Sequence, residues 1–317
     1  MATTTSLPPP PTSPIDLSGD PRRHRRERAM GSLFLATALI SVLVSALILF
    51  SLFSKGLEFF ADVEWGRVFA NDAWNPRQNR FSISTIVVGS LVVTAVAMVV
   101  AAPLGLGAAV YLSEYARPRV RAVLKPVLEV LAGIPSVVLG VFALNWIAPE
   151  LVGTFFGERE GRTGSMLAAG IGVGILTIPL MASVAEDAMR AVPTSLRQAS
   201  AGLGARKLST TLRVVLPAAV SGIVAAFILA ASRAIGETMV VFIAGGAADS
   251  AAFTASPLDG SLTMTAAMAS LATGTENVRG AGLAVPSLYF VGIVLFFITL
   301  SLNMIANRFV RRVRQAY

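Results

Sequence analysis

Two charged residues, Arg233 and Glu237, interrupt a stretch of the chain that is otherwise uncharged from residue 214 to residue 248. An arginine at membrane depth is unfavourable by about 2.5–3.5 kcal/mol on insertion scales, so such a residue is a candidate functional group. The spacing of four residues places both side chains on one helix face, where they can pair. A guanidinium offers a fork of donors that matches an oxyanion such as phosphate. We therefore predict that Arg233, Gly236, Glu237 and Thr238 line an oxyanion pathway; the alternative is an ion pair that only fixes helix packing.

A second segment with a distinctive pattern runs from residue 193 to residue 217 and contains two prolines and a glycine turn. We interpret it as a short helix, the turn, and a return helix that enters the membrane. A short helix held rigidly under a helix bundle can dock into a partner protein and transmit its motion. The candidate coupling residues are Gln198, Ala199, Ser200, Gly204, Ala205, Leu216 and Pro217.

Glycine and proline residues interrupt two other apolar stretches of the chain. Proline removes a helical hydrogen bond and kinks the helix, and broken helices often line the pathway of a transporter. The candidates for such kink or pathway positions are Gly133, Pro135, Ser136 and Pro179. Gly170 and Gly174 form a GxxxG pattern, which we interpret as a site of close helix packing.

The residues that would support catalysis are missing from the sequence. It has no cysteine and a single histidine, His24, in a polar tail. It has no GxxxxGK[ST] loop for ATP and no cluster of His, Asp or Glu with metal-ligand spacing. An intramembrane protease would need a paired aspartate, a Ser–His pair or an HExxH motif, and the predicted spans carry none of these. We therefore predict no catalytic residue, no metal site and no cofactor in this chain.

The composition indicates that membrane helices position these residues. Of the 317 residues, 54% are hydrophobic and 14% are charged, whereas ordinary soluble domains have about 45–50% and about 25%. A helix needs about 20 apolar residues to span a bilayer, and six uncharged stretches approach or exceed that length. We therefore predict an all-α membrane protein with six transmembrane helices. The stretches are Ala29–Ser54, Phe81–Ser113, Val130–Pro149 (its helix beginning near Ala122), Thr163–Ala185, Val214–Ser232 and Gly280–Asn307.

The positions of lysine and arginine predict the orientation of these helices. With the N-terminus inside, 18 of the 26 Lys and Arg residues fall in cytoplasmic segments and 7 in outer segments, with Arg233 in the membrane. Cytoplasmic loops carry an excess of Lys and Arg, so both termini are predicted to be cytoplasmic. The same bias explains the net charge of +8 without nucleic-acid binding.

The segment 193–217 resembles the EAA motif of ABC importer permeases, EAA-x3-G-x9-I-x-L-P. Gln198-Ala199-Ser200 stands at EAA, Gly204 at the glycine, Val214 at the isoleucine and Leu216-Pro217 at the final pair. The spacing matches throughout, and the departures are Gln198 for glutamate, Ser200 for alanine and Val214 for isoleucine.

Two further segments are similar to those of phosphate-specific ABC importer permeases. Leu131–Val138 is similar to their third-span signature, and Arg233–Met239 to their RAxGET motif. The methionine after GET resembles the PstC type of subunit. The resemblance covers roughly residues 30–312 and implies the type I ABC importer permease fold.

The resemblance also implies an assembly and a mechanism. It implies a heterodimer with a PstA-type permease, two PstB-type ATPase subunits that bind ATP and magnesium, and an extracytoplasmic PstS-type phosphate-binding protein. The ATPases would dock on the cytoplasmic coupling loop. Phosphate would pass Arg233 and Glu237 by alternating access, from outside to cytoplasm, in a bacterial cell membrane. The chain itself would do no chemistry.

This interpretation divides the chain into four parts. Residues 1–28 form a disordered Pro-rich, then Arg-rich, cytoplasmic tail, and residues 29–80 form the first transmembrane helix and an outer loop. Residues 81–312 form a five-helix permease core with the coupling loop near 193–213, and residues 313–317 form a cytoplasmic end. Within the last outer loop, we expect Leu262–Thr273 to be helical and to lie near the binding protein.

Three alternatives remain from the sequence. One is an ABC permease for another oxyanion (sulfate, molybdate or phosphonate), because many importers share the EAA loop. Another is a membrane channel or sensor subunit without ATP coupling. The third is a membrane-anchored nucleic-acid binder that would use the basic run Arg22–Arg28.

Overall fold

The computed structural model describes residues 21–70, 72–157, 164–247, 251–273 and 282–314, so residues 1–20 of the predicted tail lie outside the described residues. The chain divides into two units, residues 1–51 and 52–317. The described helices include six that are long and apolar enough to cross a membrane, which confirms the predicted all-α fold with six spans. They are Arg26–Asp62, Ile83–Tyr115, Ser136–Phe156, Met166–Arg190, Lys207–Ile235 and Ala284–Ala306.

The described part of the first unit belongs to a single helix, α1 (Pro21–Asp62). Its side chains between residues 26 and 51 are exposed almost throughout, although most of them are apolar. A helix that is hydrophobic on all sides is typical of a membrane span. The end of α1 belongs to the second unit, where Phe53 packs edge-to-face on Phe296 and Phe297 of α13 (Ala284–Arg314), with ring centroids 6.4 Å and 6.1 Å apart.

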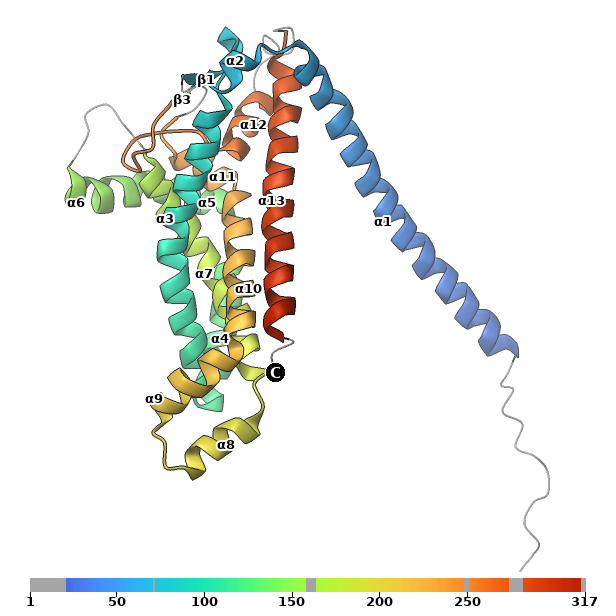
Figure 1. The fold of residues 1–317 in the computed structure, drawn as a ribbon, viewed down its shortest axis with the longest axis vertical. Helices are drawn as coiled ribbons and strands as arrows, with labels where there is room; N and C mark the ends of the chain where they lie inside the picture. Colours follow the sequence, from blue (N-terminus) through green and yellow to red (C-terminus); the bar gives the residue numbers. More distant parts are fainter. Residues whose placement is uncertain (1–20, 71, 158–163, 248–250, 274–281, 315–317) are drawn as a thin grey trace, which may run out of the picture. The chain divides into compact units, whose positions relative to one another are not determined.

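The core of the second unit is the pair α3 (Ile83–Val110) and α7 (Met166–Arg190), which run side by side (Figure 1). A Cβ atom at Gly170 would lie 2.6 Å from Val96, and one at Gly174 would lie 2.9 Å from the carbonyl oxygen of Ala97. Real Cβ contacts are not that short, so only glycine permits this approach. The predicted packing role of the GxxxG pattern is confirmed. α10 (Leu216–Ile235) packs against both α7 and α13.

The third span does not begin near Ala122, so that prediction is wrong. α4 (Pro118–Ala132) is a separate helix that Gly133 caps, and α5 (Ser136–Phe142) starts the span after Pro135. The residue before a proline is disfavoured in helical conformation, which ends the helix there. The span continues through η3 (Ala143–Gly153) into α6 (Thr154–Phe156). α4 has no fully buried residue, in contrast to its neighbours.

Pro179 behaves differently from Pro135. α7 runs through Pro179 as one continuous helix, so the predicted interruption of the fourth span does not occur. Neighbouring helices can compensate for the hydrogen bond that a proline removes within a membrane helix. Pro179 is buried within the bundle.

One end of the second unit carries a small antiparallel sheet. Its strands lie in the order β2 (Arg80–Phe81), β1 (Ala73–Asn75), β3 (Ala251–Ala252), and β1 pairs Trp74 with both Phe81 and Ala251. The short helices α2 (Trp65–Val68) and η1 (Pro76–Gln78) adjoin it in sequence. α12 (Met264–Ala272) lies near this end, and it confirms that most of Leu262–Thr273 is helical.

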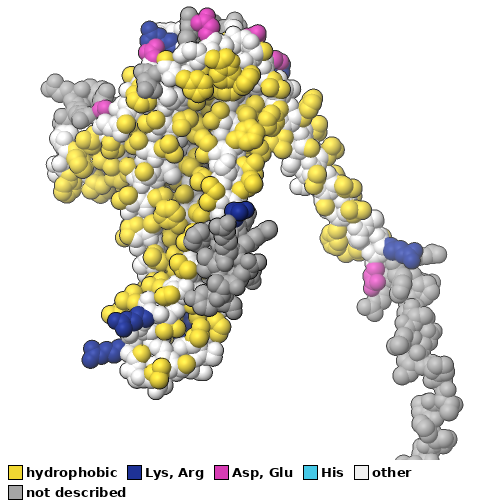
Figure 2. Space-filling view, in the orientation of Figure 1, with side chains coloured by type: hydrophobic (Ala, Val, Ile, Leu, Met, Phe, Trp, Pro, Cys, Tyr) yellow, Lys and Arg dark blue, Asp and Glu magenta, His cyan; other side chains and the backbone are white. Residues whose placement is uncertain are grey.

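The opposite end of the second unit is built from short elements (Figure 1). These are η2 (Tyr111–Tyr115), which extends α3, and then α8 (Thr194–Gly202), α9 (Lys207–Thr210) and η4 (Thr211–Val215) between α7 and α10. Figure 2 shows a mainly hydrophobic face between the two ends, with lysine and arginine side chains near α8 and α9. This arrangement suits a bundle whose middle lies in hydrocarbon.

Candidate functional site

The helix that carries Arg233 is broken directly after it. α10 ends at Ile235, Gly236 caps it, and α11 (Met239–Ala244) begins after Thr238. Glu237 is buried in this break, and its backbone carbonyl accepts a 2.7 Å hydrogen bond from the Thr265 hydroxyl of α12. The break is thereby tied to α12.

The predicted pairing of Arg233 with Glu237 is wrong. The ion pairs among the described residues include none between these two side chains. Pairing at a spacing of four residues needs a continuous helix, and α10 ends between them. The Thr238 hydroxyl donates to the carbonyl of Gly236 at 3.4 Å, within the same turn. Of the four predicted pathway residues, Arg233 alone lines one of the cavities described below.

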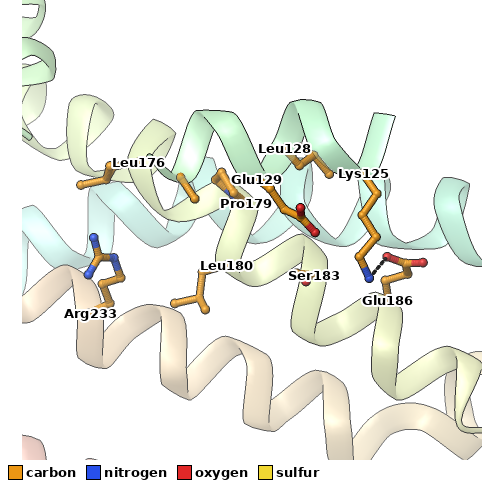
Figure 3. Close-up of a pocket in the computed structure, with 10 residues that line it drawn as sticks. Lys125, Leu128, Glu129, Leu176, Pro179, Leu180, Ser183, Glu186 and Arg233 are labelled. Carbon is orange, nitrogen blue, oxygen red and sulfur yellow. Dashed lines mark ion pairs between the residues drawn. The ribbon is translucent and has the colours of Figure 1, made fainter. Parts of the chain in front are cut away.

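Arg233 borders a cavity of about 350 Å³ between α4, α7 and α10 (Figure 3). Arg233 lies at one end of it, and Lys125 and Glu186 lie at the other. Pro179 lines this cavity, whereas Gly133, Pro135 and Ser136 do not. The other lining residues are Leu128, Glu129, Ala132, Leu176, Leu180 and Ser183.

A cluster that the sequence analysis did not identify surrounds Glu186. This carboxylate is fully buried, yet it lies 2.6 Å from Arg121 Nη2, 3.5 Å from Lys125 Nζ and 3.9 Å from Arg190 Nη1. A buried charge is tolerated when it is paired, and here the partners come from α4 and from the next turn of α7. The contacts join α4 to α7, and Lys125 also lies 3.5 Å from Asp187 Oδ1.

A larger cavity of about 750 Å³ continues toward the α8 end of the molecule. It shares Lys125 and Glu129 with the first cavity, so the two adjoin along α4. Its other lining residues include Arg121, Arg190 and Arg197. Arg233 therefore lies at one end of the first cavity, Lys125 lies where the two cavities adjoin, and Glu129 lies between them; further arginines line the second cavity.

The segment 193–217 has the predicted form of a short helix, a glycine turn and a return helix. α8 is followed by a turn in which Gly204 has a φ of +77°, and α9, η4 and α10 lead back into the bundle. Within the motif, the Ser200 and Thr210 hydroxyls lie 2.8 Å apart and join α8 to α9. Leu216 and Pro217 begin α10, where proline suits the first turn.

Most of the predicted coupling residues face solvent. Gln198, Ala199 and Gly204 are exposed, and Ala205 is half-buried. The apolar side chains Leu196 and Leu203 of the same segment are exposed too, and Leu203 keeps 88% of its surface accessible.

Arg197, which the sequence analysis also missed, attaches α8 to the bundle. Its guanidinium donates to Glu114 Oε1 at 2.9 Å and to Glu114 Oε2 at 3.4 Å, and Glu114 belongs to η2. It also donates to the carbonyls of Val192 at 2.6 Å and Met189 at 2.8 Å, at the end of α7. The Met189 carbonyl is among the last ones of α7, which lack intrahelical donors, and Val192 follows two residues after the end of α7. One side chain of α8 thus binds the ends of both core helices.

Comparison with known proteins gives the family of the chain. Residues 101–315 match the family described as binding-protein-dependent transport system inner membrane component. The phosphate transport system permease protein PstC 1 of Mycobacterium tuberculosis is 32% identical over 284 residues, which cover 82% of this chain and 83% of that protein. The probable ABC transporter permease protein YqgH of Bacillus subtilis is 35% identical over 210 residues, which cover 65% of this chain and 67% of that protein.

A solved structure supports the fold. The crystal structure of a bacterial alginate ABC transporter, in complex with an alginate pentasaccharide-bound periplasmic protein, contains a chain that matches with a TM-score of 0.64. The match is 12% identical and covers 92% of this chain and 97% of that chain, so it bears on the fold alone. Together, the match over residues 101–315 and the relatives over most of the chain show that this multi-pass membrane protein belongs to the binding-protein-dependent transport system inner membrane components, the permease subunits of ABC importers.

Proposed function

We propose that the chain is the permease subunit of an ATP-driven importer of inorganic phosphate, and that phosphate passes Arg233 on its way to the cytoplasm. The observation that carries this proposal is the Arg233 guanidinium at the edge of a cavity of about 350 Å³ between three helices. Its fork of donors matches the oxygens of phosphate. Relatives named as phosphate transport system permeases support phosphate over other oxyanions.

The proposal includes the other subunits of the importer. A PstA-type permease forms a heterodimer with this chain, and a PstS-type protein delivers phosphate at the outer end. Two PstB-type ATPases bind ATP and magnesium, and one of them docks on α8 and the turn after it, where the exposed Leu196 and Leu203 support a docking role. The chain itself carries no catalytic residue. The bias of Lys and Arg supports a topology in which both termini lie in the cytoplasm of a bacterial cell.

Transport proceeds by alternating access in this proposal. ATP binding closes the two ATPases, the docked α8 moves with them, and the bundle opens outward to accept phosphate. Hydrolysis resets the bundle and opens it inward. Arg197 carries the motion, because it connects α8 to η2 and to the end of α7.

The test of this assembly is co-purification. The chain is tagged, expressed with the subunits encoded beside it, and extracted in mild detergent. An importer permease retains an ATPase subunit on the affinity column, and reconstituted vesicles accumulate phosphate only with ATP. A chain that conducts phosphate down its gradient without any ATPase would instead be a channel, and the proposal would be wrong.

The turn at Gly204 in the coupling loop is expected to tolerate few side chains. Its φ of +77° is a left-handed conformation, which costs about 1–2 kcal/mol for residues with a Cβ atom. No other atom lies within 4 Å of a Cβ built there, so backbone strain is the only obstacle. Gly204→Val is expected to distort the turn and to lower the amount of ATPase that co-purifies at least severalfold. Gly204→Asn is the matched control, because asparagine tolerates this conformation. Equal ATPase recovery and normal uptake with both variants would contradict the assigned role of the turn.

A further inference from the structure

The cavity beside Arg233 contains polar groups that a single guanidinium site does not need. Figure 3 shows Lys125 and Glu186 together at the end away from Arg233, with the Glu129 side chain between the two ends. Lys125 and Glu129 come from α4, and Glu186 comes from α7. The cavity therefore has two charged ends, and the second end carries a carboxylate as well as cations.

Glu186 is an unusual carboxylate because it is fully buried but incompletely hydrogen-bonded. Among the described residues, neither of its oxygens has a hydrogen-bond partner of good geometry, although Arg121 Nη2 lies 2.6 Å away as an ion pair. An ionised carboxylate offers about four acceptor sites. The neighbouring cations compensate its charge and cover its oxygens, which have almost no accessible surface, so a ligand reaches them when Lys125 turns away.

Lys125 is held loosely between two carboxylates. Its ammonium lies 3.5 Å from Glu186 Oε2 and 3.5 Å from Asp187 Oδ1, whereas strong charge-assisted hydrogen bonds are about 2.7–2.9 Å long. The side chain keeps 30% of its surface accessible and borders both cavities. An ammonium has three donors, so Lys125 can turn to a ligand in either cavity without leaving Glu186 unpaired, because Arg121 remains.

We infer that the Lys125 end of this cavity is a second oxyanion station, in which Lys125 binds the anion and Glu186 accepts a hydrogen bond from a protonated oxygen of that anion. This inference rests on the proposed function, and it adds a physical basis for the selection of phosphate over sulfate. At neutral pH inorganic phosphate retains at least one proton, whereas sulfate retains none. A carboxylate accepts a hydrogen bond from the first anion and repels the second.

The size of the expected selectivity follows from how buried polar sites discriminate. A site built to bond a ligand hydroxyl rejects an analogue that lacks it by roughly 10⁴–10⁵ when the site is fully closed. This cavity is partly open, so the expected preference for phosphate over sulfate is smaller, on the order of 100-fold. The Arg233 guanidinium offers only hydrogen-bond donors, so the Arg233 end of the cavity gives no preference for phosphate over sulfate.

The experiment measures phosphate binding to the complete permease–ATPase complex in nanodiscs, without nucleotide and without the binding protein. The probes are radiolabelled phosphate and unlabelled sulfate as competitor. Lys125→Gln is expected to weaken phosphate binding at least tenfold, because the ammonium is lost. Glu186→Gln is expected to make sulfate at least a tenfold better competitor, because an amide can donate to a fully deprotonated oxyanion.

Two controls match these variants. Arg119→Gln removes a positive charge from the exposed side of α4, and Glu150→Gln removes an exposed carboxylate; neither residue lines either cavity. Both are expected to bind phosphate with wild-type selectivity. If Glu186→Gln fails to assemble because Arg121 and Arg190 lose their partner, Glu186→Asp replaces it. The shorter carboxylate retains an acceptor at a greater distance, so phosphate binding is expected to weaken while sulfate remains a poor competitor.

The outcomes separate this inference from the proposed function. Wild-type selectivity and affinity in both Lys125→Gln and Glu186→Gln would overturn the inference and leave Glu186 as a packing ion pair between α4 and α7. The proposed function would survive that result, because uptake by the wild-type importer does not depend on it. A wild-type complex that transports an oxyanion other than phosphate would overturn both.

Discussion

Arg233→Gln is expected to abolish phosphate uptake while leaving the importer assembled. The substitution removes the guanidinium from the cavity between α4, α7 and α10 and leaves a shorter, uncharged polar side chain. A hydrogen bond to a charged group contributes about 1.5–3 kcal/mol, and 1.4 kcal/mol corresponds to a factor of ten. Losing two such bonds between Arg233 and the passing phosphate lowers the uptake rate by about 100-fold or more. The measurement is initial uptake of radiolabelled phosphate at a fixed amount of complex in the membrane.

Assembly is not expected to suffer, because Arg233 is exposed in the chain and makes no ion pair among the described residues. Arg119→Gln, an exposed arginine of α4 outside both cavities, is the matched control and is expected to transport normally. Arg233→Lys keeps the charge but loses the planar fork, so it is expected to retain part of the uptake. Normal transport by Arg233→Gln would remove Arg233 from the pathway.

Arg197→Gln is expected to uncouple ATP hydrolysis from transport. It breaks the hydrogen bonds to Glu114, Met189 and Val192 that attach α8 to the bundle. The Glu114 side chain keeps only 7% of its surface accessible, so it would be left nearly buried without its cation. The loss of an ion partner at a buried carboxylate is destabilising by a few kcal/mol. The number of phosphate ions transported per ATP hydrolysed is expected to fall at least tenfold.

The coupling ratio distinguishes this effect from simple loss of docking. The exposed residues of α8 stay unchanged in Arg197→Gln, so ATPase is still expected to co-purify. Glu114→Gln is expected to weaken the same connection, and the double variant is expected to be little worse than Arg197→Gln because the two residues act as one unit. Additive losses, or an unchanged coupling ratio in Arg197→Gln, would show that α8 transmits its motion by another route.

The number of spans could be predicted because a charge at hydrocarbon depth is costly. Uncharged windows therefore mark each span, and all six are found. Their ends could not be predicted as well, because helices continue past the hydrocarbon: α1 reaches Asp62 and α7 reaches Arg190. Before the third span, the sequence stays apolar across Gly133 and Pro135, but the helix is interrupted there: α4 ends at Ala132 and α5 begins at Ser136.

The site was predictable only where its signal is local in the sequence. Arg233 is conspicuous as a charge within an apolar stretch, and the turn at Gly204 follows from its motif. The pairing of Arg233 with Glu237 failed because the spacing argument assumed a continuous helix, and Gly236 ends it. Glu186 was missed because it lies one residue beyond an uncharged window, and its main partner Arg121 lies 65 positions earlier in the chain. The Arg197–Glu114 contact spans 83 positions and leaves no local pattern.

The central claim, that this permease moves phosphate, is tested most directly by uptake in living cells. A host that lacks its own high-affinity phosphate permease expresses the chain with its neighbouring subunits, and radiolabelled phosphate uptake is measured with excess sulfate, molybdate or phosphonate. We predict ATP-dependent uptake that unlabelled phosphate blocks and the other three anions do not. An assembled complex with an active ATPase that takes up no phosphate, or whose uptake sulfate or molybdate blocks equally well, would contradict the account.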